Sequence, residues 1–427
     1  MKTYCKDADP TNVSFIEPAV WGAFRHKWKR FDYGSVLAAF GGMSYEEAHA
    51  HALNHNYDAF NKAILGIAEE ISRRIKARSL KLGPVRYEWR VDGSSGKRRE
   101  IGIETVMHQI MEHVAVHCLM PLFKVRIEDC EYASIKGRGQ ERGAKRIASW
   151  VIQDNKNAWY AQEHGFRYAR STEFYVQGDV RKCYPSMKSP MIMELLRHDI
   201  SKNEVLLWFV EELLKMHTKG LIIGSLLSQF LCNYITSIAV REVFGWKKAR
   251  REKKIQLIHH QLWYMDDLIL TGPDRRNVKM AYNKLGVYMK RRFGLELKPA
   301  FVRRWSDAPP DIMGYVIHAD GTITLRDHIY IRAKRAFIRA KGKEALAISQ
   351  ARSIISYKGR FMNSDCTVAR KRLNGDQISG TAQKLISDFD TGRLFQCLNM
   401  SSTAADPNPS PDSSTRTAQL NSVSPKM

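Results

Sequence analysis

The sequence predicts a mixed α+β fold in which an antiparallel sheet packs on helices. Apolar residues recur three and four positions apart over 57–80 and again from Ser225 onward, as on one face of a helix. Strand-like apolar runs joined by turns occur at 85–103, 262–270 and 312–325, and these runs predict β-hairpins. Helices and hairpins are therefore interspersed along the chain.

The remaining elements follow from the same patterns. Helices are expected at 57–80, 105–120, 144–155, 189–198, 202–217, from Ser225 onward, at 274–293 and at 328–348, with further helical sequence to about 395. Strands are expected on both sides of the turn at 92–96, at 173–180, in the hairpin at 262–270, at 295–298, and in the hairpin that turns at Asp320–Gly321. The segment from Ser401 is rich in Ser, Thr, Pro and Asn and is expected to be disordered.

Composition indicates a large core and a polyanionic partner. The 427 residues are 44% hydrophobic, enough for two or three subdomains. The formal charge of +24 favours nucleic acid as the partner, although an enzyme and a simple RNA binder would share it. Seven cysteines without a CxxC pair indicate reduced thiols, and neither a membrane span nor a signal peptide is visible. We therefore expect a cytoplasmic protein without a membrane partner.

Two adjacent carboxylates, Asp266 and Asp267, stand at the tip of the 262–270 hairpin. An exposed turn would explain the pair alone, but charges at the edge of an apolar layer are costly unless they are paired or bound to a metal. Asp179 ends the strand at 173–180, and adjacent strands would bring all three carboxylates to one sheet edge. Such a site suits two Mg²⁺ ions, with Mn²⁺ as a possible substitute, and the Val180 carbonyl as a further ligand.

With these residues placed, the chain resembles the bacterial reverse transcriptases, a group that includes group II intron, retron, diversity-generating and phage-defence enzymes. The resemblance runs in order from about residue 85 to 365. Its motifs are a fingers motif at 96–103, motif A at 178–184, motif B at 223–229, motif C at Tyr264-Met265-Asp266-Asp267, motif D at 294–298 and motif E at 313–317. It implies a right-hand polymerase with fingers, palm and thumb.

The resemblance also implies roles for individual residues. The three aspartates would be catalytic. Incoming dNTP would be bound by Lys97, Arg99, Tyr184, Gln229 and Lys298, with the Tyr184 ring excluding a 2′-hydroxyl. Template and primer would be bound by Arg138, Gly224, Ser228, Tyr264, Met265, Gly314, Lys334 and Arg335. The stretch 135–139 lacks the Arg-Pro-Gly-Arg-like core of the second fingers motif, and Ile223 before Gly224 is more like the diversity-generating and defence enzymes.

The implied domains are an N-terminal helical extension (1–84), fingers (85–170), palm (171–317), thumb (318–398) and a disordered tail (399–427). The implied function is RNA-directed DNA synthesis on a bound, structured non-coding RNA, giving an RNA–DNA hybrid, and most like the class 2 defence enzymes of the unknown group. The alternatives are a diversity-generating enzyme, an RNA-dependent RNA polymerase, against which Tyr184 argues, and an idle RNA-binding protein with a polymerase fold. The oligomeric state stays open.

One further pattern is a histidine pair. His113 and His117 lie four residues apart on one helix face, which is half of a zinc motif. No third ligand follows at a suitable spacing, so a structural role is expected for both.

Overall fold

The computed structural model describes residues 3–91, 96–250, 253–343 and 346–390. It has the predicted α+β class. A four-stranded antiparallel sheet has the order β6-β7-β3-β8, with bounds β3 (Phe174–Asp179), β6 (His260–Tyr264), β7 (Asp267–Gly272) and β8 (Val302–Arg304). The hairpin predicted at 262–270 is therefore confirmed as β6 and β7.

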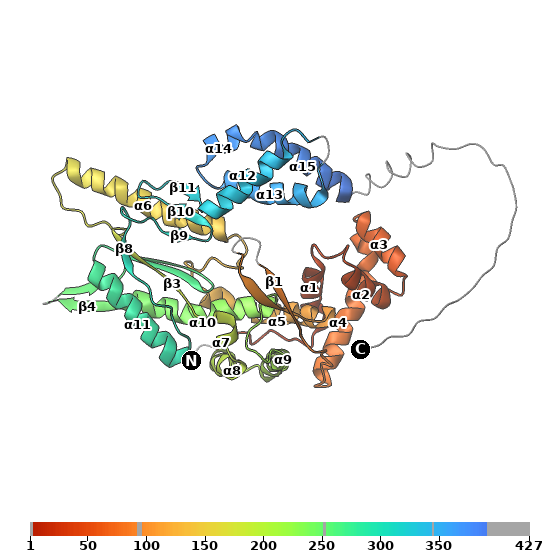
Figure 1. Cartoon of the computed structure of the whole chain (residues 1–427). Coiled ribbons are helices and arrows are strands. Elements are labelled where there is room, and N and C mark those ends of the chain that lie inside the picture. The colour runs from red at the N-terminus through yellow and green to blue at the C-terminus, as the bar shows by residue number, and fades with distance from the viewer. Residues whose placement is uncertain (1–2, 92–95, 251–252, 344–345, 391–427) are drawn as a thin grey trace, which may run out of the picture.

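Side chains of the central sheet alternate between its two faces, and other elements cover both faces (Figure 1). Val176, Leu268 and Leu270 belong to a core that includes α10 (Leu226–Gly245) and α11 (Arg275–Phe293). Tyr175 and Ile269, on the opposite face, belong to a second core with α6 (Gln140–Glu163). Burial on both faces explains the nearly continuous apolar run 268–270.

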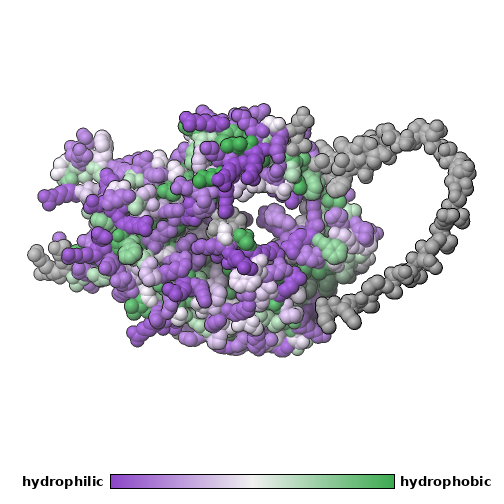
Figure 2. Space-filling model, viewed as in Figure 1, coloured by the Kyte–Doolittle hydropathy of each residue, from purple (hydrophilic) through white to green (hydrophobic). Residues whose placement is uncertain are grey.

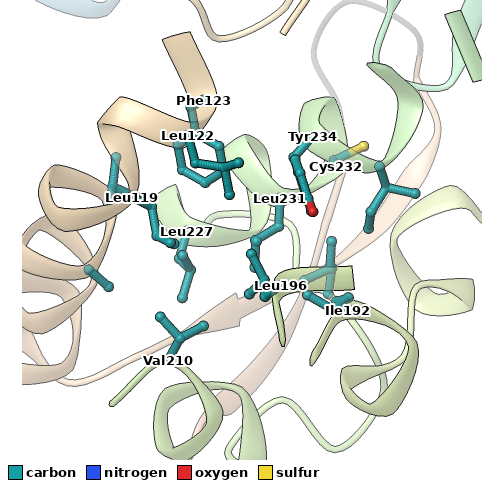
Figure 3. Packing of buried hydrophobic residues seen from close by; sticks show 14 of the residues in the cluster. Leu119, Leu122, Phe123, Ile192, Leu196, Val210, Leu227, Leu231, Cys232 and Tyr234 are labelled. Carbon is teal, nitrogen blue, oxygen red and sulfur yellow. The ribbon is translucent and has the colours of Figure 1, made fainter. Parts of the chain in front are cut away.

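The largest core lies among four helices. Leu119, Leu122 and Phe123 of α5 (Val106–Arg126) face Leu227 and Leu231 of α10 (Figure 3). Residues of α8 (Ser189–Asp199) and α9 (Glu204–Lys215) close this core from the other side. The N-terminal helices α1 (Val13–Phe24) and α2 (Phe31–Gly41) pack against α5. The helices α3 (Tyr45–Leu53) and α4 (Asn61–Lys76) and the short 3-10 helix η1 (Tyr57–Phe60) pack in turn on these N-terminal helices and on one another.

Smaller elements surround the central sheet. They are the hairpins β1 (Arg86–Val91) with β2 (Arg98–Ile103) and β4 (Lys247–Arg250) with β5 (Lys253–Gln256), the short helix α7 (Cys183–Ser186), and the sheet of β9 (Asp311–Ile312), β10 (Tyr315–Ile317) and β11 (Ile323–Leu325). The C-terminal helices are α12 (Asp327–Ala340), α13 (Ile348–Met362), α14 (Thr367–Arg372) and α15 (Gly375–Asp390).

An opening passes through the molecule beneath the C-terminal helices, and mostly hydrophilic residues surround it (Figure 2). The β1–β2 hairpin reaches α12 on one side of it, since a Cβ added at Gly96 would lie 3.8 Å from Arg332 Nη2. Lys334 and Arg335 are exposed on α12. The C-terminal helices and the β1–β2 hairpin thus lie on two sides of this opening (Figures 1 and 2).

Several element predictions need correction. α5 continues beyond Pro121, because the packing of Leu122 and Phe123 in the core outweighs the backbone hydrogen bond that proline removes. The helix predicted at 328–348 ends at Ala340, shortly before Gly342, whose φ is +76°. The basic run 247–254 forms the β4–β5 strands on either side of the two undescribed residues.

Other expectations were too coarse or were not made. The strand at 295–298 is reduced to one bridge, between Leu297 and Val180. The helices before residue 57 were predicted only as part of a helical extension over 1–84, without individual bounds. The turn at 92–95 and the tail at 399–427 lie outside the described residues. Within the described ranges, no helix is both long and apolar enough to cross a membrane.

Candidate active site at the sheet edge

The three predicted aspartates meet at one edge of the central sheet. Asp179, the last residue of β3, lies opposite Asp267, the first residue of β7. Asp266 occupies the two-residue turn before β7, and its carbonyl accepts a hydrogen bond of 2.9 Å from the Val180 N–H. The neighbouring turn residue Met265 has φ of 55°, a left-handed conformation that is costly for methionine. Strain of this kind is common at functional sites.

The carboxylates repel one another in a poorly solvated place. Burial raises the pKa of Asp267 to about 6, and the negative charges of Asp266 and Asp179 contribute to the rise. Burial also raises the pKa of Asp266, with a further contribution from Asp179. Oδ1 of Asp179 is buried, and the ammonium group of Lys298 lies 2.7 Å from it. The site therefore concentrates negative charge.

Cations from three other segments partly compensate this charge. Lys298 Nζ forms an ion pair of 2.7 Å with Asp179 Oδ1, and the Lys298 N–H donates to the Asp179 carbonyl. The charges of Arg99 and Lys298 partly offset the rise in the pKa of Asp266. The charges of Arg326 and Lys97 likewise partly offset the rise in the pKa of Asp267. The exposed side chains of Lys97 and Arg99 on the β1–β2 hairpin thus lie within electrostatic reach of the aspartates.

The segment before α10 supports this hairpin. Gly224 has φ of +115°, and a Cβ there would lie 3.0 Å from the Gly102 carbonyl oxygen, so glycine is required. The Gly102 N–H donates to the Ile223 carbonyl at 3.1 Å. Ser228 is buried and accepts a hydrogen bond from the Ile222 N–H, so it holds this loop. Gln229 is half-buried.

Tyr184 lies beside the strained turn. Its hydroxyl donates to Met265 Sδ at 3.6 Å, and the ring packs against the main core. Burial raises the pKa of Tyr184 well above its ordinary value, so the hydroxyl stays neutral. The side chain sits on α7, five residues after Asp179, where a ring could limit what lies next to the carboxylates.

Three further predicted residues, Tyr264, Gly314 and Arg138, make contacts within the protein. Tyr264 packs in the second core. Gly314, with φ of +86°, closes the turn between β9 and β10, and a Cβ there would clash with Arg360 Nη1 at 2.8 Å. Arg138 binds the loop before it, donating to the Glu128 and Glu131 carbonyls and to Asp129 Oδ1. In this conformation its guanidinium is engaged within the protein.

Sequence reasoning missed two features. Arg326 Nε lies 2.6 Å from Asp311 Oδ1 and influences Asp267, yet an arginine after a short strand carries no distinctive pattern. The second is a buried group formed by Glu104, His108, Glu112 and His217. The predicted histidine pair is separate from it: the His117 ring contacts Phe15, with centroids 4.9 Å apart, and His113 faces Gly22. A structural role for this pair agrees with these contacts.

No family model matches the sequence, and no curated protein matches it. Among solved structures, the chain is similar to telomerase of Candida albicans in complex with a fragment of telomeric RNA. The sequence identity is 12%, the match covers 84% of this chain and 75% of that chain, and the TM-score is 0.38. It is also similar to apo telomerase of Candida tropicalis, with 9% identity, 87% and 78% coverage and the same TM-score. These scores are too low to assign a family or an activity.

Proposed function

We propose that the protein is an RNA-directed DNA polymerase that works by two-metal nucleotidyl transfer. The observation that carries this proposal is the convergence of Asp179, Asp266 and Asp267 at one sheet edge, reached by a basic hairpin. The order of the sequence motifs supports it. In this proposal residues 85–170 are the fingers, 171–317 the palm and 318–398 the thumb, after a helical extension at 1–84.

The donor set fits divalent cations such as Mg²⁺ or Mn²⁺. All the candidate ligands are oxygens, from the three carboxylates and the Val180 carbonyl, and hard cations prefer such ligands. The mutual repulsion of the carboxylates, which contributes to the raised pKa of Asp267, would be relieved by positive charge. When bound, two such ions would activate a primer 3′-hydroxyl and stabilise the leaving pyrophosphate.

The chain's own cations supply the rest of the electrostatics. Lys97 and Arg99 approach the aspartates from the hairpin and would bind the triphosphate of an incoming dNTP. Lys298, held against Asp179, would neutralise or protonate the pyrophosphate as it leaves. Gln229, in the first turn of α10, is proposed to join them in binding the nucleotide. These groups bind and orient the nucleotide, and the aspartates position the metals.

Tyr184 is proposed to select deoxynucleotides. Changing Tyr184 to Ala should raise incorporation of rNTP relative to dNTP by about 10- to 100-fold, because the open space would admit a 2′-hydroxyl. Single-nucleotide extension with matched dNTP and rNTP measures this ratio. Tyr184→Phe keeps the ring and loses only the bond to Met265, so it should keep the original selectivity. An unchanged ratio in the alanine variant would contradict this role.

The exposed cations of α12 are proposed to hold template and product. Lys334 and Arg335 on α12 face solvent, as do many of the hydrophilic residues around the opening (Figure 2). Cationic side chains of this kind bind an RNA–DNA hybrid through its phosphates. Gly314, Tyr264 and Met265 would contact the primer, while Gly224, Ser228 and Arg138 would shape the template path.

The proposed biological role is antiphage defence, with a structured non-coding RNA as template. The charge of +24 suits a stably bound RNA, and Ile223-Gly224 resembles both the defence and the diversity-generating enzymes. Sequencing of RNA and cDNA that co-purify with the protein is expected to give one abundant non-coding RNA, with cDNA that increases on infection. Adenine-specific errors in the cDNA of a variable protein gene would instead indicate diversification.

A further inference from the structure

A second group of titratable side chains is buried beneath the hairpin and beside α10. We name Glu104, His108, Glu112 and His217 the Glu/His cluster. All four side chains are buried, and one ligand atom from each lies within 4.8 Å of the others. None of these residues belongs to the strands that carry the aspartates.

Local structure explains how the cluster forms. Thr105 caps α5 by accepting a hydrogen bond from the His108 N–H, and this cap fixes Glu104 immediately before the helix. His108 and Glu112 follow at intervals of four, so the three residues face the same way. His217 comes from the turn after α9 and completes the group. Two elements far apart in the sequence thus present two imidazoles and two carboxylates to one point.

The distances suit a single small cation. His217 Nε2 lies 2.9 Å from Glu104 Oε1 and 3.7 Å from Glu112 Oε1. His108 Nε2 lies 3.8 Å from Glu104 Oε1. Ligands about 2.0–2.1 Å from a tetrahedral Zn²⁺ ion are separated by about 3.3 Å, so small adjustments would complete the site.

The cluster is poorly satisfied by protein groups alone. His108 is 0% exposed, and neither of its ring nitrogens has a hydrogen-bond partner. Unpartnered buried polar groups of this kind are rare and cost about 1–3 kcal/mol. His217 Nε2 is hydrogen-bonded to Glu104 Oε1, whereas the His108 ring has no such partner. A cation would serve both carboxylates and both rings at once.

We propose that the Glu/His cluster binds one transition-metal ion, with Zn²⁺ as the best-fitting ion. Imidazole ligands favour Zn²⁺ and its neighbours, whereas Mg²⁺ prefers a shell of oxygens and water. The ion is structural rather than catalytic, because every ligand is buried. This site is independent of the two-metal site proposed at the aspartates.

The ion would also stabilise the segment that supports the candidate active site. The Glu112 carboxylate accepts a hydrogen bond from Ser225 Oγ and another, of 3.0 Å, from the Leu226 N–H. Those groups form the N-terminus of α10, directly after Gly224. A metal that fixes Glu112 therefore fixes the loop against which the basic hairpin packs.

Metal analysis of the full-length protein tests the proposal. Purified protein, incubated with zinc and then desalted, is expected to hold about one equivalent of Zn²⁺ per chain, and the double variant His108→Gln/His217→Gln less than about a tenth. His113→Gln, on the same helix outside the cluster, should keep the metal. Asp266→Asn/Asp267→Asn should also keep it, which separates this site from the proposed polymerase centre.

Two outcomes would overturn the proposal: wild-type protein that binds no transition metal after zinc incubation, or a double variant that binds as much as wild type. If the double variant does not fold, Co²⁺ titration of wild-type protein decides the question. A visible tetrahedral Co²⁺ spectrum that saturates near one equivalent and is reversed by Zn²⁺ supports the site. Absence of that spectrum rules it out.

Discussion

Replacing Asp266 and Asp267 together by asparagine is expected to abolish dNTP incorporation, with a loss of at least about a thousandfold. The two side chains supply most of the carboxylate oxygens at the sheet edge, and metal-assisted stabilisation of the transition state is worth several kcal/mol, each 1.4 kcal/mol being about tenfold in rate. Primer extension on an RNA template measures the effect. Asp307→Asn, an exposed aspartate near the same sheet, is the matched control and should retain full activity.

The same substitution should leave the fold intact and make the metal-free protein more stable. Neutral amides remove the repulsion that, with burial, raises the pKa of both aspartates. A gain of about 1–3 kcal/mol is expected from Asp267 alone at neutral pH. Thermal unfolding without Mg²⁺ checks this. Undiminished synthesis by a folded double variant would refute the proposed catalytic centre.

The aspartate site was predictable because its geometry follows from short-range rules. A two-residue turn between paired strands places Asp266 and Asp267 at the hairpin tip, and the antiparallel pairing with β3 places Asp179 opposite Asp267. Each of these residues also stands at a strand end that the apolar pattern marks. The local sequence pattern therefore predicts the three-dimensional positions of these aspartates correctly.

The Glu/His cluster was not predictable in the same way. His217 lies 113 positions along the chain from Glu104, and the two meet only because α9 packs against α5. The histidine pair that the sequence makes visible does not point to this cluster, because His113 and His117 lie on a different part of the surface of α5 from His108. Tertiary packing also decides the length of α5, where the buried residues after Pro121 override a local helix breaker.

The basic side chains were only partly predictable. Composition predicts a polyanionic partner, and the hairpin cations Lys97 and Arg99 do lie toward the aspartates. Arg138 was expected to face template, yet it donates to three groups of its own loop. Charge alone cannot distinguish these cases, because an arginine satisfies backbone carbonyls as readily as phosphates.

Removal of Mg²⁺ should abolish synthesis, and the stabilising effect of Mg²⁺ should disappear as the pH falls through about 6. The folded-state pKa of Asp267 is about 6, above its ordinary value of 3.8. The folded state thus binds this proton more tightly than the unfolded state. The metal-free protein is destabilised by this group above about pH 6, and the penalty declines as the pH falls toward 3.8.

Mg²⁺ competes with that proton for the same oxygens, so its effect on thermal stability should be largest near about pH 8 and small near about pH 5. Unfolding temperatures in Mg²⁺-free and Mg²⁺-containing buffers, compared between wild type and Asp266→Asn/Asp267→Asn, isolate these carboxylates from other titrating groups. Buffers without chelators leave the Glu/His cluster undisturbed. Equal stabilisation of wild type and variant by Mg²⁺ would mean that the ion binds elsewhere, and the aspartates would then need another partner to explain their convergence.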